Sequence, residues 1–217
     1  MPSAFVEPPD GPIDLEKAVA AVPPGATIKG VFLGALLGEA KRRNLVLAGA
    51  RDRYVPFQSY PLVEHMRLLV EGARKFFPDA TTRVGLRKLG RAAHTAFLES
   101  TVGRVIWAGA QDMHGAIGAL VKGYPVMTSS TRVLVTELAP EHAIVRLEHV
   151  PCFLDSHQVG VFEGFFRALG VRGHVLVRLE SNHAGDFRLE WASEARKGPE
   201  STSGEPKGRL GPPSRRG

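Results

Sequence analysis

The sequence contains a single cysteine, Cys152, among its 217 residues. One cysteine excludes an internal disulfide and any zinc site built from several thiolates, so the chain has no need of an oxidising compartment. Its first residues also lack the basic start and the continuous apolar stretch of a secretory signal. We therefore expect a cytoplasmic protein.

Long apolar runs are missing as well. The longest one, over residues 31–37, is interrupted by Gly34 and is soon followed by three basic residues at 41–43. A membrane-spanning helix needs about 20 predominantly apolar residues, so none is predicted.

A strong charge on the folded part is also lacking. The net charge is +6, but residues 193–217 hold six Lys or Arg against three Glu and so contribute +3 of it. Half of the excess thus belongs to the end of the chain, which argues against a folded surface that binds nucleic acid.

Composition and local sequence predict three segments. Prolines are frequent at the start, which predicts an extended arm over residues 1–26. Residues 27–192 have the apolar content of one globular domain. Residues 193–217 carry almost no large apolar side chain, so they cannot offset the entropy of ordering and are predicted to be a disordered basic tail.

Apolar spacing changes its period along the domain. The spacing predicts helices over residues 27–43, 61–77, 82–109 and 114–123, with a break in the third region near residues 99–103. In the first helix, glycines at every fourth position from Gly30 to Gly38 predict a closely packed face. This half of the chain is therefore expected to be helical.

From Arg132 onward the apolar residues alternate, which predicts strands over residues 132–138, 145–148, 174–180 and 186–191. One helix separates the two strand pairs. We therefore predict an α+β fold, in which the helical N-terminal half packs on a C-terminal antiparallel sheet with strand-strand-helix-strand-strand order.

The helix between the strand pairs has several local signals. Asp155 is predicted to be its N-cap, with Gln158 at the third helical position completing a capping box, and Gly170 suits the left-handed C-cap. Gly160 and Gly164 share one side of this helix, so we expect that side to pack closely on a neighbouring element.

Residues 151–164, which read PCFLDSHQVGVFEG, resemble a protein family known to us, as do residues 169–171 and 187–191. The family is a myxobacterial group of paralogues described only as a domain of unknown function. Its fold is in turn distantly similar to that of haem-based nitric-oxide sensors and of vinyl-reductase-type small-molecule domains. The resemblance implies a sensory or ligand-binding α+β fold and no established reaction.

The leading functional hypothesis is a non-enzymatic regulatory or sensory module that binds an apolar small molecule or a protein partner. Its candidate site residues gather around the helix of the resemblance, and Glu163 could lie either in a ligand cleft or on the polar side of that helix. A homodimer remains an open alternative. The candidates are Phe153, Asp155, Gly160, Phe162, Glu163 and Gly164.

A haem-based gas sensor is the first alternative. The haem sensors hold the propionates with a Tyr-x-Ser-x-Arg pattern and the iron with a helical histidine. Here Ser130 and Arg132 fit that spacing, but Thr128 stands in place of the tyrosine, and His94 is the candidate axial ligand. The incomplete pattern predicts a protein without haem.

An enzyme whose site is assembled from distant residues is the second alternative. Cys152 lies near His149 and His157 in the sequence, and a neighbouring imidazole can activate a thiol. A buried and inert cysteine is the interpretation that we prefer. No His-Glu-x-x-His pattern or close histidine pair predicts a metal site.

Overall fold

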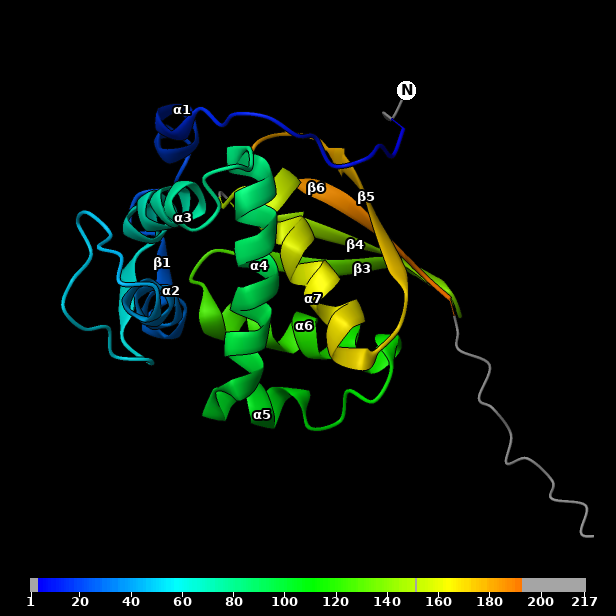
Figure 1. Cartoon of the computed structure of the whole chain (residues 1–217). Coiled ribbons are helices and arrows are strands. Elements are labelled where there is room, and N and C mark those ends of the chain that lie inside the picture. Colours follow the sequence, from blue (N-terminus) through cyan, green and yellow to red (C-terminus); the bar gives the residue numbers. More distant parts are fainter. Residues whose placement is uncertain (1–3, 151, 193–217) are drawn as a thin grey trace, which may run out of the picture.

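The computed structural model describes residues 4–150 and 152–192. Figure 1 shows a group of helices on one side, a sheet on the other and the long helix α4 between them. The predicted α+β fold, with helices in the N-terminal half and an antiparallel sheet at the C-terminal end, is confirmed. The predicted tail, residues 193–217, lies outside the described residues.

The N-terminal arm is not extended throughout. Between the prolines at 12 and 23 it forms the short helix α1 (Leu15–Ala20), whose N-cap Asp14 accepts a hydrogen bond from the backbone N of Lys17 at 3.0 Å. Nearer the start, Val6 is extended and exchanges two backbone hydrogen bonds of 2.9 Å with Val177 at the edge of the sheet. The prediction of an extended arm over residues 1–26 is therefore wrong at α1, where proline is absent.

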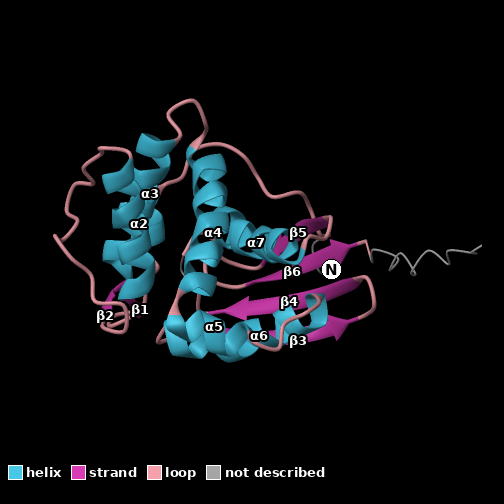
Figure 2. Ribbon diagram, turned by 60° about the horizontal axis from the view of Figure 1, so that its bottom comes forward, coloured by secondary structure: helices cyan, strands magenta, loops and turns pink. Residues whose placement is uncertain are grey.

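A small two-stranded sheet and two helices follow the arm. Strand β1 (Thr27–Lys29) pairs antiparallel with β2 (Ser59–Pro61). Each strand leads directly into a helix, α2 (Gly30–Arg42) after β1 and α3 (Leu62–Phe76) after β2. The pairing therefore sets α2 and α3 beside each other, as Figure 2 shows.

The predicted glycine face of α2 packs closely at one position only. A Cβ added at Gly30 would lie 3.0 Å from the carbonyl carbon of Val55, which backbone atoms rarely allow. At Gly34 and Gly38 the nearest atoms would be 3.9 Å away, an ordinary contact distance. The expectation of a closely packed glycine face is therefore wrong for Gly34, which lies beside Tyr54, and for Gly38, which lies beside the side chain of Arg42.

The helical half ends with α4 (Thr82–Glu99), α5 (Thr101–Trp107) and α6 (Met113–Met127). The predicted break near residues 99–103 is confirmed. Ser100 ends α4 with an extended backbone, and its side chain caps α5 by accepting from the backbone N of Gly103 at 3.0 Å.

The C-terminal sheet has four antiparallel strands in the order β3-β4-β6-β5. They are β3 (Arg132–Leu138), β4 (His142–Glu148), β5 (Gly173–Leu179) and β6 (Gly185–Trp191). The strand-strand-helix-strand-strand order is confirmed. Pairing of β4 with β6 joins the two predicted hairpins into one sheet.

The connection between the hairpins begins differently from the prediction. A turn of π-helix, η1 (Leu154–Gln158), comes first, and α7 (Val159–Leu169) continues from it. The residue before η1, Phe153, has left-handed backbone angles, and no side chain caps this helix. The capping role of Asp155 is therefore wrong, because its carboxylate accepts instead from the guanidinium of Arg83 on α4 at 2.9 Å.

Helix α7 packs its aromatic side against the inner face of the sheet and forms the core there. Phe162 on α7 and Phe187 on β6 are both fully buried, with ring centroids 4.9 Å apart. Other buried residues of the inner face of the sheet are Val133, Ala143, Val145, Leu147, Val175, Val177 and Leu189.

The part of the chain that is described contains no helix long and apolar enough to cross a membrane.

Candidate functional site

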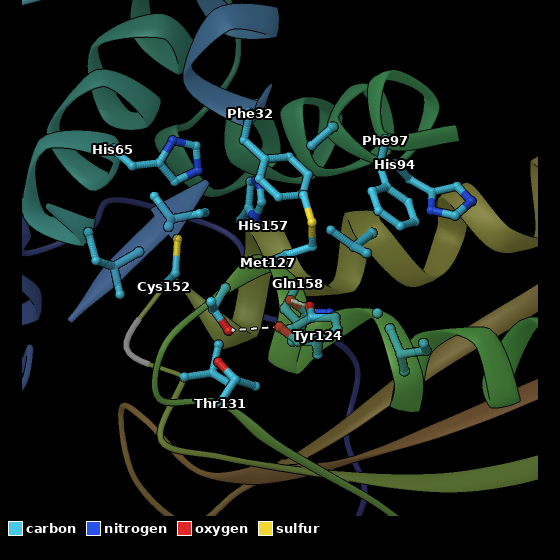
Figure 3. A pocket seen from close by; sticks show the side chains of 18 of the residues that line it. Phe32, His65, His94, Phe97, Tyr124, Met127, Thr131, Cys152, His157 and Gln158 are labelled. Atoms are coloured by element: carbon cyan, nitrogen blue, oxygen red, sulfur yellow. Dashed lines mark hydrogen bonds between the residues drawn. The ribbon is translucent and has the colours of Figure 1, made fainter. Parts of the chain in front are cut away.

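An apolar cavity of about 100 Å³ lies where the α2–α3 pair, α4 and α6 meet η1 and α7. Its walls come from segments that are up to about 140 residues apart in the sequence. Figure 3 shows it from close by. The lining residues are Ile28, Phe32, Leu62, His65, Ala93, His94, Phe97, Trp107, Ala119, Leu120, Gly123, Tyr124, Met127, Thr128, Thr131, Val150, Cys152, His157, Gln158, Val161 and Phe165.

The lining is apolar and uncharged. None of the described residues around the cavity is an Asp, Glu, Lys or Arg. In the same described part of the chain, no group of three or more His, Cys, Asp and Glu side chains is placed to hold a metal ion. A charged ligand would therefore lose its hydration here without a compensating partner.

Two buried histidines meet at one wall of this cavity. His65 on α3 and His157 on η1 are 2% and 7% exposed, and their ring centroids lie 6.2 Å apart with the ring planes at 89°. Burial, together with the neighbouring His157, lowers the pKa of His65 to about 3, and burial lowers the pKa of His157 to about 4. Both imidazoles are therefore neutral near pH 7.

A third buried histidine, His94 on α4, also lines the cavity. Its ring lies between two aromatic rings, with centroids 4.8 Å from Trp107 and 4.6 Å from Phe165. Burial lowers its pKa to about 4. Aromatic packing therefore holds this imidazole, which is neutral, on the α4 side of the cavity.

The polar side chains nearer the sheet are also neutral. The hydroxyl of Tyr124 on α6 donates a hydrogen bond to the amide oxygen of Gln158, and burial raises the pKa of this tyrosine. Cys152 is buried, and burial raises the pKa of its thiol to about 12. A thiol that stays protonated is a poor nucleophile, which agrees with the predicted inert cysteine.

A surface groove adjoins the cavity between α2 and α4. Phe32, His65 and Ala93 line both the groove and the cavity, so these side chains form the wall between them. The ring of Phe32 also stacks on that of Phe97, with centroids 6.3 Å apart. The aromatic side chain of Phe32 thus lies where the groove and the cavity meet.

The six predicted site residues do not line this cavity. Phe153 and Asp155 instead line a second, more polar pocket of about 200 Å³ between α1, α4 and η1. Its other polar members include Arg83 and Asn182. The role of these residues in ligand binding stays a prediction.

The remaining candidates lie where α7 crosses α4 or packs on the sheet. A Cβ added at Gly160 would lie 2.8 Å from the carbonyl carbon of Arg87, and one at Gly164 would lie 2.7 Å from Cβ of His94. The predicted close packing of this glycine side is confirmed. Glu163 lies at the same crossing, where its carboxylate pairs with Arg87 and, at 3.1 Å, with Arg91, while Phe162 points into the core.

The residues of the haem alternative are not gathered at one site. His94 lines the cavity, but the hydroxyl of Ser130 donates to the carbonyl of His149 at 3.4 Å, and Arg132, 66% exposed, lies 3.6 Å from Glu148. A drug-sized ligand needs a pocket of roughly 300–1,000 Å³. Neither the volume nor the polar residues present fit a haem.

The sequence interpretation gave no role to His65, and it named His157 only as a possible partner of Cys152 and Gln158 only as part of a helix cap. His65 lies within the apolar stripe of α3, between Leu62 and Met66 and near Leu69, and a histidine in a buried stripe is a signal that could have been used. The place of His157 in the cavity wall could not be predicted, because it lies on η1, whose π-helical turn the sequence does not predict.

Solved structures with the same arrangement of elements are H-NOX proteins. The Fe(II)CO state of the H-NOX domain from Shewanella oneidensis matches with a TM-score of 0.59 and 13% identity, over 77% of this chain and all of that one. The Fe(II) unliganded H-NOX protein from K. algicida matches with a TM-score of 0.55 and 14% identity, over 77% and 98% of the two chains. At this identity the likeness concerns the fold, which is H-NOX-like.

The family is shown by a separate comparison. The family described as Protein of unknown function (DUF2378) matches residues 21–192, and this chain belongs to it. No curated protein matches the sequence. Both parts of the resemblance found here, to a family of unknown function and to the haem nitric-oxide sensor fold, are therefore confirmed, whereas the likeness to vinyl-reductase-type domains stays a prediction.

Proposed function

We propose that the protein is a non-enzymatic regulatory or sensory module that binds a small apolar molecule in the cavity between α3, α4, α6 and η1. The observation that carries the proposal is the uncharged, largely apolar lining, with a few convergent polar groups. Ligand sites commonly have this composition. The H-NOX-like fold agrees with a sensory role by analogy.

The size of the cavity indicates the size of the ligand. A dry protein cavity of roughly 150 Å³ accepts benzene or xenon. At about 100 Å³ the present cavity is smaller than that, so it suits a molecule of at most a single ring. A protein partner is less well supported, because a cavity of about 100 Å³ is far smaller than a protein–protein interface.

The titratable groups around the cavity support binding in preference to catalysis. A general acid or base works best when its pKa lies near the operating pH. Here the pKa values of His65, His94 and His157 are lowered to about 3 or 4, and that of Cys152 is raised to about 12. None of these groups is poised for proton transfer at pH 7.

Toluene is a suitable first probe for thermal unfolding experiments. At ten times its Kd, a ligand that binds only the folded state stabilises it by about 1.4 kcal/mol, which raises Tm by roughly 3–6 °C for a domain of this size. We expect a saturable rise of this kind in the unmodified protein.

The matched variants are Ala119→Leu and Ala168→Leu. Ala119 lines the cavity on α6, so leucine should fill it and abolish the toluene effect, whereas Ala168 is exposed on α7 and should leave the effect unchanged. If toluene stabilises neither the unmodified protein nor Ala168→Leu, or stabilises Ala119→Leu equally, binding in this cavity is refuted.

A haem sensor is the second candidate, and the placement of His94 in the cavity wall favours it. We nevertheless expect a protein without haem, because Ser130 and Arg132 lie outside the cavity. Haem titration followed by absorption, with His94→Ala as the comparison, tests this expectation. A Soret band that saturates at one equivalent and is lost in the variant would make the haem sensor the leading function.

A further inference from the structure

Several polar atoms of the cavity lining have no hydrogen-bond partner among the described residues. They are Nδ1 of His65, Nε2 of His94, Nε2 of His157 and the amide nitrogen of Gln158, all on side chains at least 93% buried. Buried polar atoms are normally paired, and an unpaired one costs stability. Such atoms around a cavity point to a ligand that pairs with them.

Two of these atoms belong to consecutive residues of η1. His157 and Gln158 both line the cavity, and the ring of His65 lies edge to face with that of His157. The amide oxygen of Gln158 accepts from the hydroxyl of Tyr124, and its NH₂ group has no acceptor in the part of the chain that the structure describes. In Figure 3 His157 is drawn near His65 and Gln158 beside Tyr124, whereas Phe97 and His94 lie farther to the right.

The backbone of η1 holds the two side chains in place. Its π-helical turn follows Phe153 in the left-handed region at φ 47°, a conformation that a bulky residue adopts at a cost. Helix α4 stabilises the turn in two ways. Arg83 binds the carboxylate of Asp155, and Gly90 allows the backbone to approach so closely that an added Cβ would lie 3.0 Å from the carbonyl carbon of His157.

These donors and acceptors restrict the chemistry of the ligand. A neutral imidazole has one donor and one acceptor nitrogen, and the amide of Gln158 supplies N–H donors. A hydroxyl can donate to an imidazole nitrogen and accept from an amide at the same time. A hydrocarbon would leave both groups unpaired, and a carboxylate would be buried without a cation, since no charged side chain lines the cavity in the described part of the chain.

We propose that the cavity selects an uncharged apolar molecule of about the size of one ring that carries a hydroxyl group, which hydrogen-bonds to His157 and Gln158. This inference rests on the proposed function and adds the chemical class of the ligand. Burial, which lowers the pKa of His157 to about 4, agrees with an imidazole that is free to accept near pH 7.

Phenol, toluene and benzoate are three probes of similar shape that differ in the polar group. Calorimetric titration of each gives the ratio of phenol to toluene affinity. A hydrogen bond to a buried neutral group changes affinity by about tenfold, so His157→Phe should lower this ratio about tenfold. The control His114→Phe, at an exposed position on α6 that does not line the cavity, should leave the ratio unchanged.

The outcomes separate this inference from the function on which it rests. Toluene binding with an unchanged ratio in His157→Phe, or benzoate binding more tightly than phenol, would overturn the hydroxyl preference and leave the apolar cavity intact. Binding of none of the probes would overturn both.

A measurement on the unmodified protein covers the case in which His157→Phe does not fold. The ¹⁵N resonance of Nε2 of His157 should shift when phenol is added and should not shift to the same extent with toluene. Equal shifts with the two probes would contradict a hydrogen bond from the hydroxyl.

Discussion

Replacing Gly160 by alanine should weaken the crossing of α7 on α4, which forms one side of the cavity. The new Cβ would lie 2.8 Å from the carbonyl carbon of Arg87 and 3.1 Å from its Cα, whereas ordinary contacts begin at 3.4 Å. These neighbours are backbone atoms, so no side-chain rotation relieves the overlap. The two helices must move apart by at least about 0.6 Å at this point, which contacts along the whole crossing resist.

The magnitude follows from two opposing effects. Overpacking of a core costs about 1–3 kcal/mol, and alanine regains up to about 1 kcal/mol through its better helix propensity. Gly118 on α6 isolates the second effect, because a Cβ there meets nothing within 4 Å. We therefore expect Gly118→Ala to be neutral or stabilising by up to about 1 kcal/mol, and Gly160→Ala to be about 1–3 kcal/mol less stable than Gly118→Ala.

Thermal and urea unfolding of both variants measure the difference. For a domain of this size 1 kcal/mol corresponds to about 2–4 °C, so the Tm of Gly160→Ala should lie roughly 2–12 °C below that of Gly118→Ala. Gly164→Ala, whose Cβ would lie 2.7 Å from Cβ of His94, should also destabilise. Equal unfolding midpoints for Gly118→Ala and Gly160→Ala would refute the close crossing.

Two further predictions concern titration and reactivity. The pKa values of His65 and His157 in the folded state, about 3 and about 4, lie below the ordinary value of 6.5, so the unfolded chain binds more protons and stability falls as the pH drops below 6.5 toward 4. Each imidazole should contribute about 2 kcal/mol to the loss of unfolding free energy between pH 7 and pH 5. Urea titrations should show that His157→Phe removes the contribution of His157, whereas His114→Phe leaves the pH dependence unchanged. The same pH dependence in both variants would contradict neutral burial. Cys152, 8% exposed and with a pKa raised to about 12, should react slowly with iodoacetamide in the native state and rapidly in urea, and fast stoichiometric labelling of the native protein would show that the thiol is accessible.

Local sequence patterns determined most of the secondary structure of this protein. The change from helical spacing to alternation near Arg132 predicted where helices give way to strands, because a period of 3.6 or of 2 decides which side chains can share a buried face. Gly170 has a left-handed backbone at φ 69° and ends α7 as expected, since glycine adopts that conformation without steric cost. The close approach at Gly160 was likewise readable from its spacing with Gly164.

Tertiary structure alone decided how α7 begins. Asp155 has the sequence context of an N-cap, yet its carboxylate binds Arg83, which is 72 residues away in the chain. A charge-assisted bond to a guanidinium competes with the weaker bond of a cap to its own backbone. The π-helical turn and the left-handed Phe153 lie beside that distant contact, and no local pattern predicts them.

The cavity also depended on the tertiary structure. Phe32, His65, His94, Tyr124 and His157 come from five different helical elements, and they become neighbours only when those elements pack. A cavity is a volume that side chains fail to fill, and local periodicity describes only which faces are apolar. The sequence therefore identified the buried faces, whereas the packing of distant elements determined where space and unpaired polar atoms remain together.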